Sequence, residues 1–197
     1  TRMEHVNTTI VEKPQEGITT VAARIAKLIN RREANGQKTV LSLASGRSMR
    51  DLFVELVRLH KEEGLSFKNV VIFGSYEFYP LADSSMGSMA QIQSQLLDHI
   101  DILPENVHTF PGDLPKETIF AFCEEYEKAI TEAGGLDIQV LGIGPCGNIS
   151  MNEPGTQPNS STRLVIMDGN SRVDVKSLFG NVAQVPTCAI TLGIDTI

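Results

Sequence analysis

The residues best suited to chemistry lie in one glycine-rich segment, residues 141–155. An apolar run at residues 138–141 leads into it and predicts a buried strand. The segment carries the thiol of Cys146, the amide of Asn148 and the carboxylate of Glu153. Ligands of α/β proteins bind at the carboxyl ends of strands. This segment is therefore the first candidate for a functional site.

The glycines of this segment have the spacing Gly142-x-Gly144-x-x-Gly147, which is that of a dinucleotide-binding loop. Such a loop needs a helix directly after it, because the helix N-terminus faces the pyrophosphate. Pro154 and Pro158 leave no room for that helix. We therefore predict no nicotinamide or flavin cofactor.

A second candidate is the loop formed by Ser45, Gly46, Arg47 and Ser48, which lies between a predicted strand and a predicted helix. Backbone N–H groups in such a loop, together with the helix N-terminus, bind anions. The two serine hydroxyls could each donate to a phosphate oxygen. Ser48 could equally cap the helix, and spacing alone does not separate these two interpretations.

A third candidate is an aromatic segment in which Tyr76 precedes Glu77, after the predicted strand 69–73. It is either the wall of a site or a packed loop. Neighbouring residues of an extended segment point to opposite sides. Tyr76 and Glu77 are therefore not expected to face the same space.

Helices and strands alternate along the chain and would position these residues. Helices are predicted over residues 17–35, 48–63, 88–97, 116–132 and 171–179, and strands over 39–43, 69–73, 107–110, 138–141, 163–167 and 188–194. This order predicts an α/β fold with a doubly wound, mostly parallel sheet and helices on both faces. We expect residues 1–197 to form a single domain.

Composition and charge exclude several classes of partner. Hydrophobic residues make up 41% of the 197 residues, which is enough for a sizeable core. The net charge of −7 argues against nucleic acid or an anionic membrane surface. No apolar run is long enough to span a membrane, and residues 1–5 do not resemble a signal peptide. A phosphorylated small molecule remains compatible, since it needs only a local cradle of N–H groups.

The cysteines and histidines show no metal-binding spacing, so no metal site is predicted. Cys123, Cys146 and Cys188 form no CxxC pair, which favours a reducing, cytoplasmic setting. Cys123 is expected in the core. Cys146 could be a reactive thiol, although no base is identifiable near it.

Taken in order, these segments resemble the glucosamine-6-phosphate deaminase (isomerase) family, whose superfamily also holds 6-phosphogluconolactonases. The matching segments are residues 41–48, 56–71, 99–102, 104–107, 142–155, 161–163, 185–186 and 191–193. The resemblance runs from about Val40 to the end of the chain. It implies a doubly wound α/β fold, a sugar-phosphate ligand and a homo-oligomer.

The residues that would carry the family's chemistry differ. Members convert glucosamine 6-phosphate to fructose 6-phosphate and ammonia, using an Asp that moves a proton between C1 and C2. Tyr76 stands in the place of that Asp, Cys146 replaces a second Asp, and Asn148 replaces a ring-opening His, whereas Glu153 is retained. Only about one tyrosine in a thousand is ionised at neutral pH. An asparagine side chain cannot shuttle a proton.

The phosphate side of the resemblance is mixed. Ser45, Gly46 and Ser48 fit the family's phosphate loop, and Arg47 and Gly144 join them as predicted binding residues. Ser177 replaces a family Arg, with Lys176 beside it as a substitute. A further phosphate-binding Lys of the family would lie beyond Ile197, so the chain is predicted to be a fragment of a longer protein.

Three functions remain open from the sequence. The first is a divergent deaminase, in which Glu153, Tyr76, Cys146 and Asn148 are the candidate catalytic residues. The second is a sensor that binds a sugar phosphate without turning it over. The third is a scaffold domain that serves oligomerisation or a fused partner domain.

Overall fold

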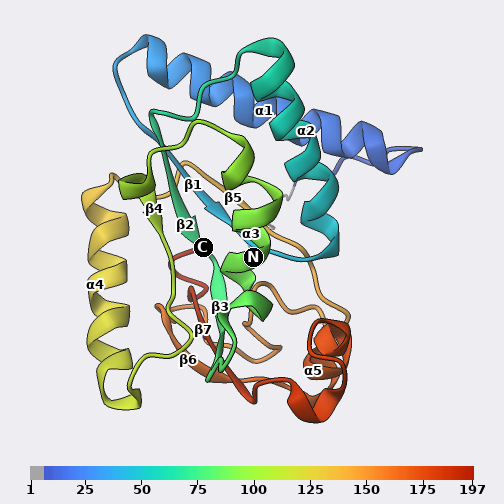
Figure 1. Cartoon of the computed structure of the whole chain (residues 1–197), viewed down its shortest axis with the longest axis vertical. Helices are drawn as coiled ribbons and strands as arrows, with labels where there is room; N and C mark the ends of the chain where they lie inside the picture. The colour runs from blue at the N-terminus through green and yellow to red at the C-terminus, as the bar shows by residue number, and fades with distance from the viewer. Residues whose placement is uncertain (1–6) are drawn as a thin grey trace, which may run out of the picture.

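The structure is a computed structural model that describes residues 7–197. The start of the chain, for which no signal peptide is predicted, lies outside the described residues. Four parallel strands form the first sheet, in the order β4-β2-β1-β5 (Figure 1). Their bounds are β1 Thr39–Leu43, β2 Val70–Gly74, β4 Val107–His108 and β5 Ile138–Val140.

Helices cover both faces of this sheet. The bounds of these helices are α1 Pro14–Ala34, α2 Arg47–Glu63, α3 Ser88–Gln95 and α4 Ile119–Glu132. A further helix, α5 Gly169–Val175, packs through Val175 against a separate cluster that includes Phe78 and Ala189. Alternate strand residues point to opposite faces, so Leu41 and Ile72 pack with α1, α2 and α3. Val40 and Phe73 pack with α4. In Figure 1, α4 stands on the left, away from α1 and α2.

Three further strands form a separate antiparallel sheet, in the order β3-β7-β6. Their bounds are β3 Tyr76–Tyr79, β6 Arg163–Ile166 and β7 Cys188–Thr191. Only Ser75 separates β2 from β3. Its N–H donates to the carbonyl of Leu43 at 3.0 Å, and its carbonyl accepts from the N–H of Leu192 at 3.0 Å. The chain therefore passes directly from the first sheet into the second at this residue.

The α/β class and the mostly parallel sheet predicted from the sequence are confirmed. The strands predicted at residues 163–167 and 188–194 form β6 and β7, and these two lie in the antiparallel sheet, where β7 pairs with β3 and β6. Residues 76–79, for which a site wall or a packed loop was left open, form the strand β3, whose first residue, Tyr76, lines a pocket. The pairing of β3 with β7 joins segments more than a hundred residues apart, so local patterns could not reveal it.

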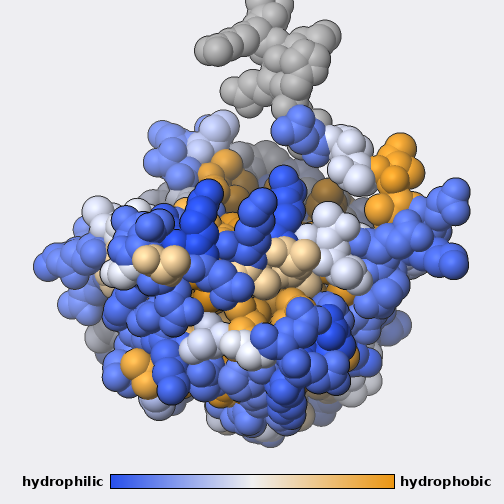
Figure 2. Space-filling view, turned by 90° about the horizontal axis from the view of Figure 1, so that it is seen from above, coloured by the Kyte–Doolittle hydropathy of each residue, from blue (hydrophilic) through white to orange (hydrophobic). Residues whose placement is uncertain are grey.

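Hydrophilic residues cover most of the face seen in Figure 2, with hydrophobic residues in a strip between them. Among the helices of residues 7–197, none is both long and apolar enough to cross a membrane.

Glu77 of β3 is buried and ties the second sheet to α3. Its Oε1 accepts from the N–H groups of Phe78 at 2.9 Å and Ser88 at 2.7 Å, and its Oε2 accepts from Met89 at 2.9 Å. The last two donors belong to the first turn of α3, whose N–H groups have no partner inside the helix. Despite these donors, burial raises the pKa of the Glu77 carboxyl above its ordinary value.

This burial predicts a pH-dependent stability. A raised pKa in the folded state gives stability that is present below the unfolded pKa, near 4.5, and is lost as pH rises through the folded pKa. Raising the pH from 4.5 should therefore lower the unfolding free energy of the wild type relative to Glu77→Gln, as measured by urea denaturation. Glu124→Gln, at an exposed position of α4, should not show this trend. A constant difference for Glu77→Gln would contradict the assignment.

Candidate functional site

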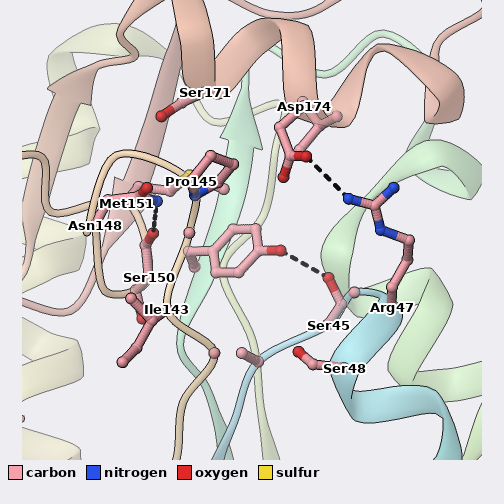
Figure 3. Close-up of a pocket in the computed structure, with 16 residues that line it drawn as sticks. Ser45, Arg47, Ser48, Ile143, Pro145, Asn148, Ser150, Met151, Ser171 and Asp174 are labelled. Atoms are coloured by element: carbon pink, nitrogen blue, oxygen red, sulfur yellow. Dashed lines mark hydrogen bonds and ion pairs between the residues drawn. The ribbon is translucent and has the colours of Figure 1, made fainter.

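A pocket of about 420 Å³ lies at the carboxyl ends of β1 and β5 (Figure 3). The chain continues from β1 through α2 to β2 of the same sheet, whereas β5 continues into residues 141–162 and then into a strand outside this sheet. The carboxyl ends of strands are where α/β sheets bind ligands. The lining residues are Ala44, Ser45, Gly46, Arg47, Ser48, Tyr76, Gly142, Ile143, Gly144, Pro145, Asn148, Ser150, Met151, Ser171, Asp174 and Val175.

One end of the pocket is the N-terminus of α2. Gly46 precedes the helix with a φ of 117°, a backbone conformation that side-chain-bearing residues rarely adopt. No side chain caps the helix, so Ser48 is not the cap that the sequence allowed. The first N–H groups of α2 are therefore available to an anion. The Ser48 hydroxyl lies over Gly142, where an added Cβ would be 3.0 Å from Oγ.

Tyr76 stands beside this loop. Its hydroxyl lies 2.9 Å from the hydroxyl of Ser45, within hydrogen-bonding distance. Burial raises the pKa of the Tyr76 phenol above its ordinary value, and the hydrogen bond with Ser45 offsets this only in part. The side chain is therefore a neutral hydroxyl at physiological pH.

The opposite wall presents polar atoms that lack partners. Asn148 Oδ1, Ser150 Oγ and Ser171 Oγ are buried and make no hydrogen bond. Asn148 Nδ2 donates to the carbonyl of Ser150 at 3.1 Å, which fixes the orientation of the amide. Unpaired buried polar atoms are costly. These three atoms are therefore candidates for contacts with hydroxyl or amine groups of a ligand.

An ion pair lies at the mouth of the pocket. Arg47 Nη2, from the first residue of α2, donates to Asp174 Oδ1 of α5 at 2.9 Å. The Arg47 side chain is 81% exposed and that of Asp174 is 34% exposed. Figure 3 shows the Asp174 carboxylate between Ser171 and Arg47, on the side of the pocket formed by α5. The pair therefore connects two helices that are far apart in sequence.

The structure brings together most, but not all, of the predicted site residues. Ser45, Gly46, Arg47, Ser48, Tyr76, Gly144 and Asn148 line the pocket. Cys146, Glu153 and Lys176 are outside its lining. Glu153 Oε1 accepts from the N–H of Asp168 at 3.3 Å, while its Oε2 is buried without a partner. Lys176 is exposed at the end of α5.

Sequence reasoning missed the contribution of α5 to the pocket. Ser171 and Asp174 come from a helix predicted at about the right place, but only Lys176 of that predicted helix was named as a binding residue. Nothing in their spacing signals a site, because only the tertiary fold brings α5 to the N-terminus of α2. Ser150 was also missed. It has a φ of 52°, and a residue with positive φ is not recognisable from its type.

The sequence predicted neither a dinucleotide-binding loop nor a metal site, and the structure describes both regions. Residues 142–162 form turns and isolated bridges rather than a helix after the glycine spacing. Within residues 7–197, no group of three or more His, Cys, Asp or Glu side chains is arranged to hold a metal ion.

The structure is thus an α/β domain with a candidate ligand pocket at the carboxyl ends of β1 and β5. The sequence profile of the family described as glucosamine-6-phosphate isomerases/6-phosphogluconolactonase matches residues 12–171. The chain belongs to this family, as the resemblance implied.

Similar proteins agree with this assignment. A glucosamine-6-phosphate deaminase-like protein of Bacteroides thetaiotaomicron is 44% identical over the whole chain, which spans only 30% of that protein's length. A glucosamine-6-phosphate deaminase of Porphyromonas gingivalis is 37% identical over 95% of the chain and 72% of its own length. The solved structure of a monomeric glucosamine-6-phosphate deaminase matches with a TM-score of 0.86 and 32% identity, over 95% of this chain and 76% of that chain.

A more distant structure shares the fold alone. The 6-phosphogluconolactonase of Thermotoga maritima matches with a TM-score of 0.65 and 22% identity, over 89% of this chain and 72% of that chain.

The close packing of Gly144 predicts the effect of a single methyl group. An added Cβ at Gly144 would lie 2.1 Å from Asn148 Oδ1, so the Asn148 side chain would have to move. Gly144→Ala should destabilise the protein by about 1–3 kcal/mol in urea denaturation. Gly169→Ala is the matched control, since a Cβ there meets open space. Equal stability of the two variants would show that Asn148 is not held as described.

Proposed function

We propose that this domain binds an amino-sugar phosphate in the pocket between β1 and β5 and does not catalyse the deamination typical of its family. One observation carries the proposal. A neutral phenol, Tyr76, hydrogen-bonded to Ser45, occupies the place where the resemblance puts the proton-transferring carboxylate. A hydroxyl that keeps its proton at neutral pH cannot act as that base.

The binding half of the proposal is supported by the two ends of the pocket. The uncapped N-terminus of α2 and the Ser48 hydroxyl offer donors to a phosphate. The unpaired atoms of Asn148, Ser150 and Ser171 offer partners to the sugar. A ligand with an anionic group and several hydroxyl groups would satisfy both ends together.

The second part of the proposal, that the domain does not catalyse deamination, is supported by the small number of titratable groups that line the pocket. Among its lining residues these are Arg47, Tyr76 and Asp174. The Tyr76 phenol keeps its proton, because burial raises its pKa, and the Asp174 carboxylate is paired with the Arg47 guanidinium. Loss of a general base typically lowers a rate by about 10²- to 10⁴-fold.

A divergent deaminase is the second candidate, favoured by Glu153. This residue matches the family's retained carboxylate, and its Oε2 is buried without a hydrogen-bond partner. Such an atom could take part in ring opening if the ligand or a loop movement brought it a partner. Ammonia release separates this candidate from a binding domain.

The proposal also covers the length, the cellular location and the oligomeric state of the whole protein. The chain spans 30% of the Bacteroides relative and 72% of the Porphyromonas relative, and we propose that it is one domain of a longer protein. The cysteine pattern supports a cytoplasmic location. The homo-oligomer implied by the resemblance stays a prediction, and the solved deaminase with the TM-score of 0.86 is described as monomeric.

Calorimetric titration with glucosamine 6-phosphate, followed by an ammonia assay of the same sample, tests this function. We expect saturable binding and no ammonia above the protein-free blank. Ser48→Ala should weaken binding by about 3- to 10-fold, because one hydrogen bond to a charged phosphate is lost. Ser161→Ala, at an exposed position outside the pocket lining, is the matched control. Ammonia equal to or above the protein concentration would favour the divergent deaminase, and no binding would contradict both candidates.

A further inference from the structure

Two charged side chains at the mouth of the pocket lie at helix ends that do not favour them. Arg47 is the first residue of α2, and Arg50 lies in the same first turn, which contains no acidic residue. The N-terminus of a helix carries a partial positive charge, so cations are unfavourable there. Asp174 lies in the last turn of α5, where the partial charge is negative. Each of the two charges is therefore unfavourable with respect to its own helix.

The ion pair between the two side chains compensates for both placements. Arg47 Nη2 donates to Asp174 Oδ1 at 2.9 Å (Figure 3). The carboxylate of α5 thus supplies the negative charge that the first turn of α2 lacks. Burial raises the pKa of the Tyr76 phenol above its ordinary value, and the negative charge of Asp174 adds to this effect. Asp174 is therefore within electrostatic range of the pocket interior.

The ion pair is weak enough to be exchanged for another contact. A single hydrogen bond joins the two side chains, whereas a bidentate contact between an arginine and a carboxylate has two parallel ones. The Arg47 side chain is 81% exposed and that of Asp174 is 34% exposed. Ion pairs with such access to solvent contribute little to stability. A stronger anion near Arg47 would therefore displace Asp174.

A phosphate bound at the N-terminus of α2 would be that stronger anion. Gly46 and Ser48, which belong to the predicted phosphate loop, directly flank Arg47 in sequence and line the same pocket. At pH 7 a phosphate monoester carries a charge of about −1.5 to −2 and three acceptor oxygens. A carboxylate carries one charge and two oxygens. The planar guanidinium of an arginine also forms two parallel hydrogen bonds with phosphate oxygens.

We propose that Arg47 exchanges its partner when the pocket binds a ligand, from the Asp174 carboxylate to the phosphate of the ligand. This inference rests on the proposed function, since it needs a phosphate at the N-terminus of α2. Asp174 acts as an internal competitor that neutralises Arg47 until a phosphate arrives. A ligand that must first break an internal contact binds more weakly by the free energy of that contact. Asp174 therefore sets how strongly the pocket holds a phosphate.

A double-mutant cycle, measured by calorimetric titration with glucosamine 6-phosphate at pH 7, tests this exchange. The proteins are the wild type, Asp174→Asn, Arg47→Gln and the variant that carries both substitutions. Arg47→Gln should weaken binding by at least about 10-fold, because charge-assisted hydrogen bonds to the phosphate are lost. Asp174→Asn should tighten binding by about 3- to 5-fold, because the ligand no longer has to break the ion pair. In the Arg47→Gln background, Asp174→Asn should change the Kd by less than about twofold.

Asp195→Asn is the matched control for the loss of charge. It removes one carboxylate at an exposed position outside the pocket and should leave the affinity of the wild type unchanged.

The outcomes separate this inference from the function on which it rests. If Asp174→Asn tightens binding equally with and without Arg47, Asp174 only repels the phosphate, and the exchange is overturned. Unchanged or weaker binding by Asp174→Asn alone overturns it as well, because the carboxylate then does not compete for Arg47. Binding by Arg47→Gln as tight as that of the wild type would show that Arg47 does not contact the phosphate. If none of the four proteins binds the ligand, the proposed function fails and the inference fails with it.

Discussion

The backbone of Ser75 is the junction on which the site depends. Its N–H and carbonyl groups join the end of β1 to the end of β7, and its hydroxyl lies 3.0 Å from that of Ser42 in the buried sheet. Because side chains alternate along a strand, this junction directs Tyr76 into the pocket and Glu77 towards α3. The two neighbouring residues thus have separate roles, one in the site and one in holding a helix. A shift of one residue at Ser75 would exchange these roles.

Much of the parallel sheet and its helices could be predicted from the sequence, because periodicity is a local property. The strand at residues 39–43 and the helix ending at Glu63 were predicted at their observed ends. Helix α1 begins three residues earlier than predicted, since Pro14 is well suited to a first helical position. The two loops that form the pocket were also predicted, because each follows an apolar run and contains glycine.

The rest of the site depends on contacts between distant segments. Asp174 meets Arg47 across 127 positions of sequence, and β3 exists only because β7 pairs with it. Lys176 was predicted from the resemblance alone, and Glu153 from both the glycine-rich segment and the resemblance, and the structure leaves both outside the pocket lining. Matching a family motif therefore identified the region of the site, while its actual walls are set by how α5 and the antiparallel sheet pack.

We propose that the pocket binds an amino-sugar phosphate but has no base that moves the proton of this ligand. Proton NMR of glucosamine 6-phosphate with the protein in deuterated buffer tests both parts in one sample. We expect saturation transfer from protein to sugar, which reports binding, and an undiminished signal from the hydrogen at C2 over hours. Loss of the C2 signal at a rate proportional to protein concentration would show proton exchange at that carbon and would contradict the account.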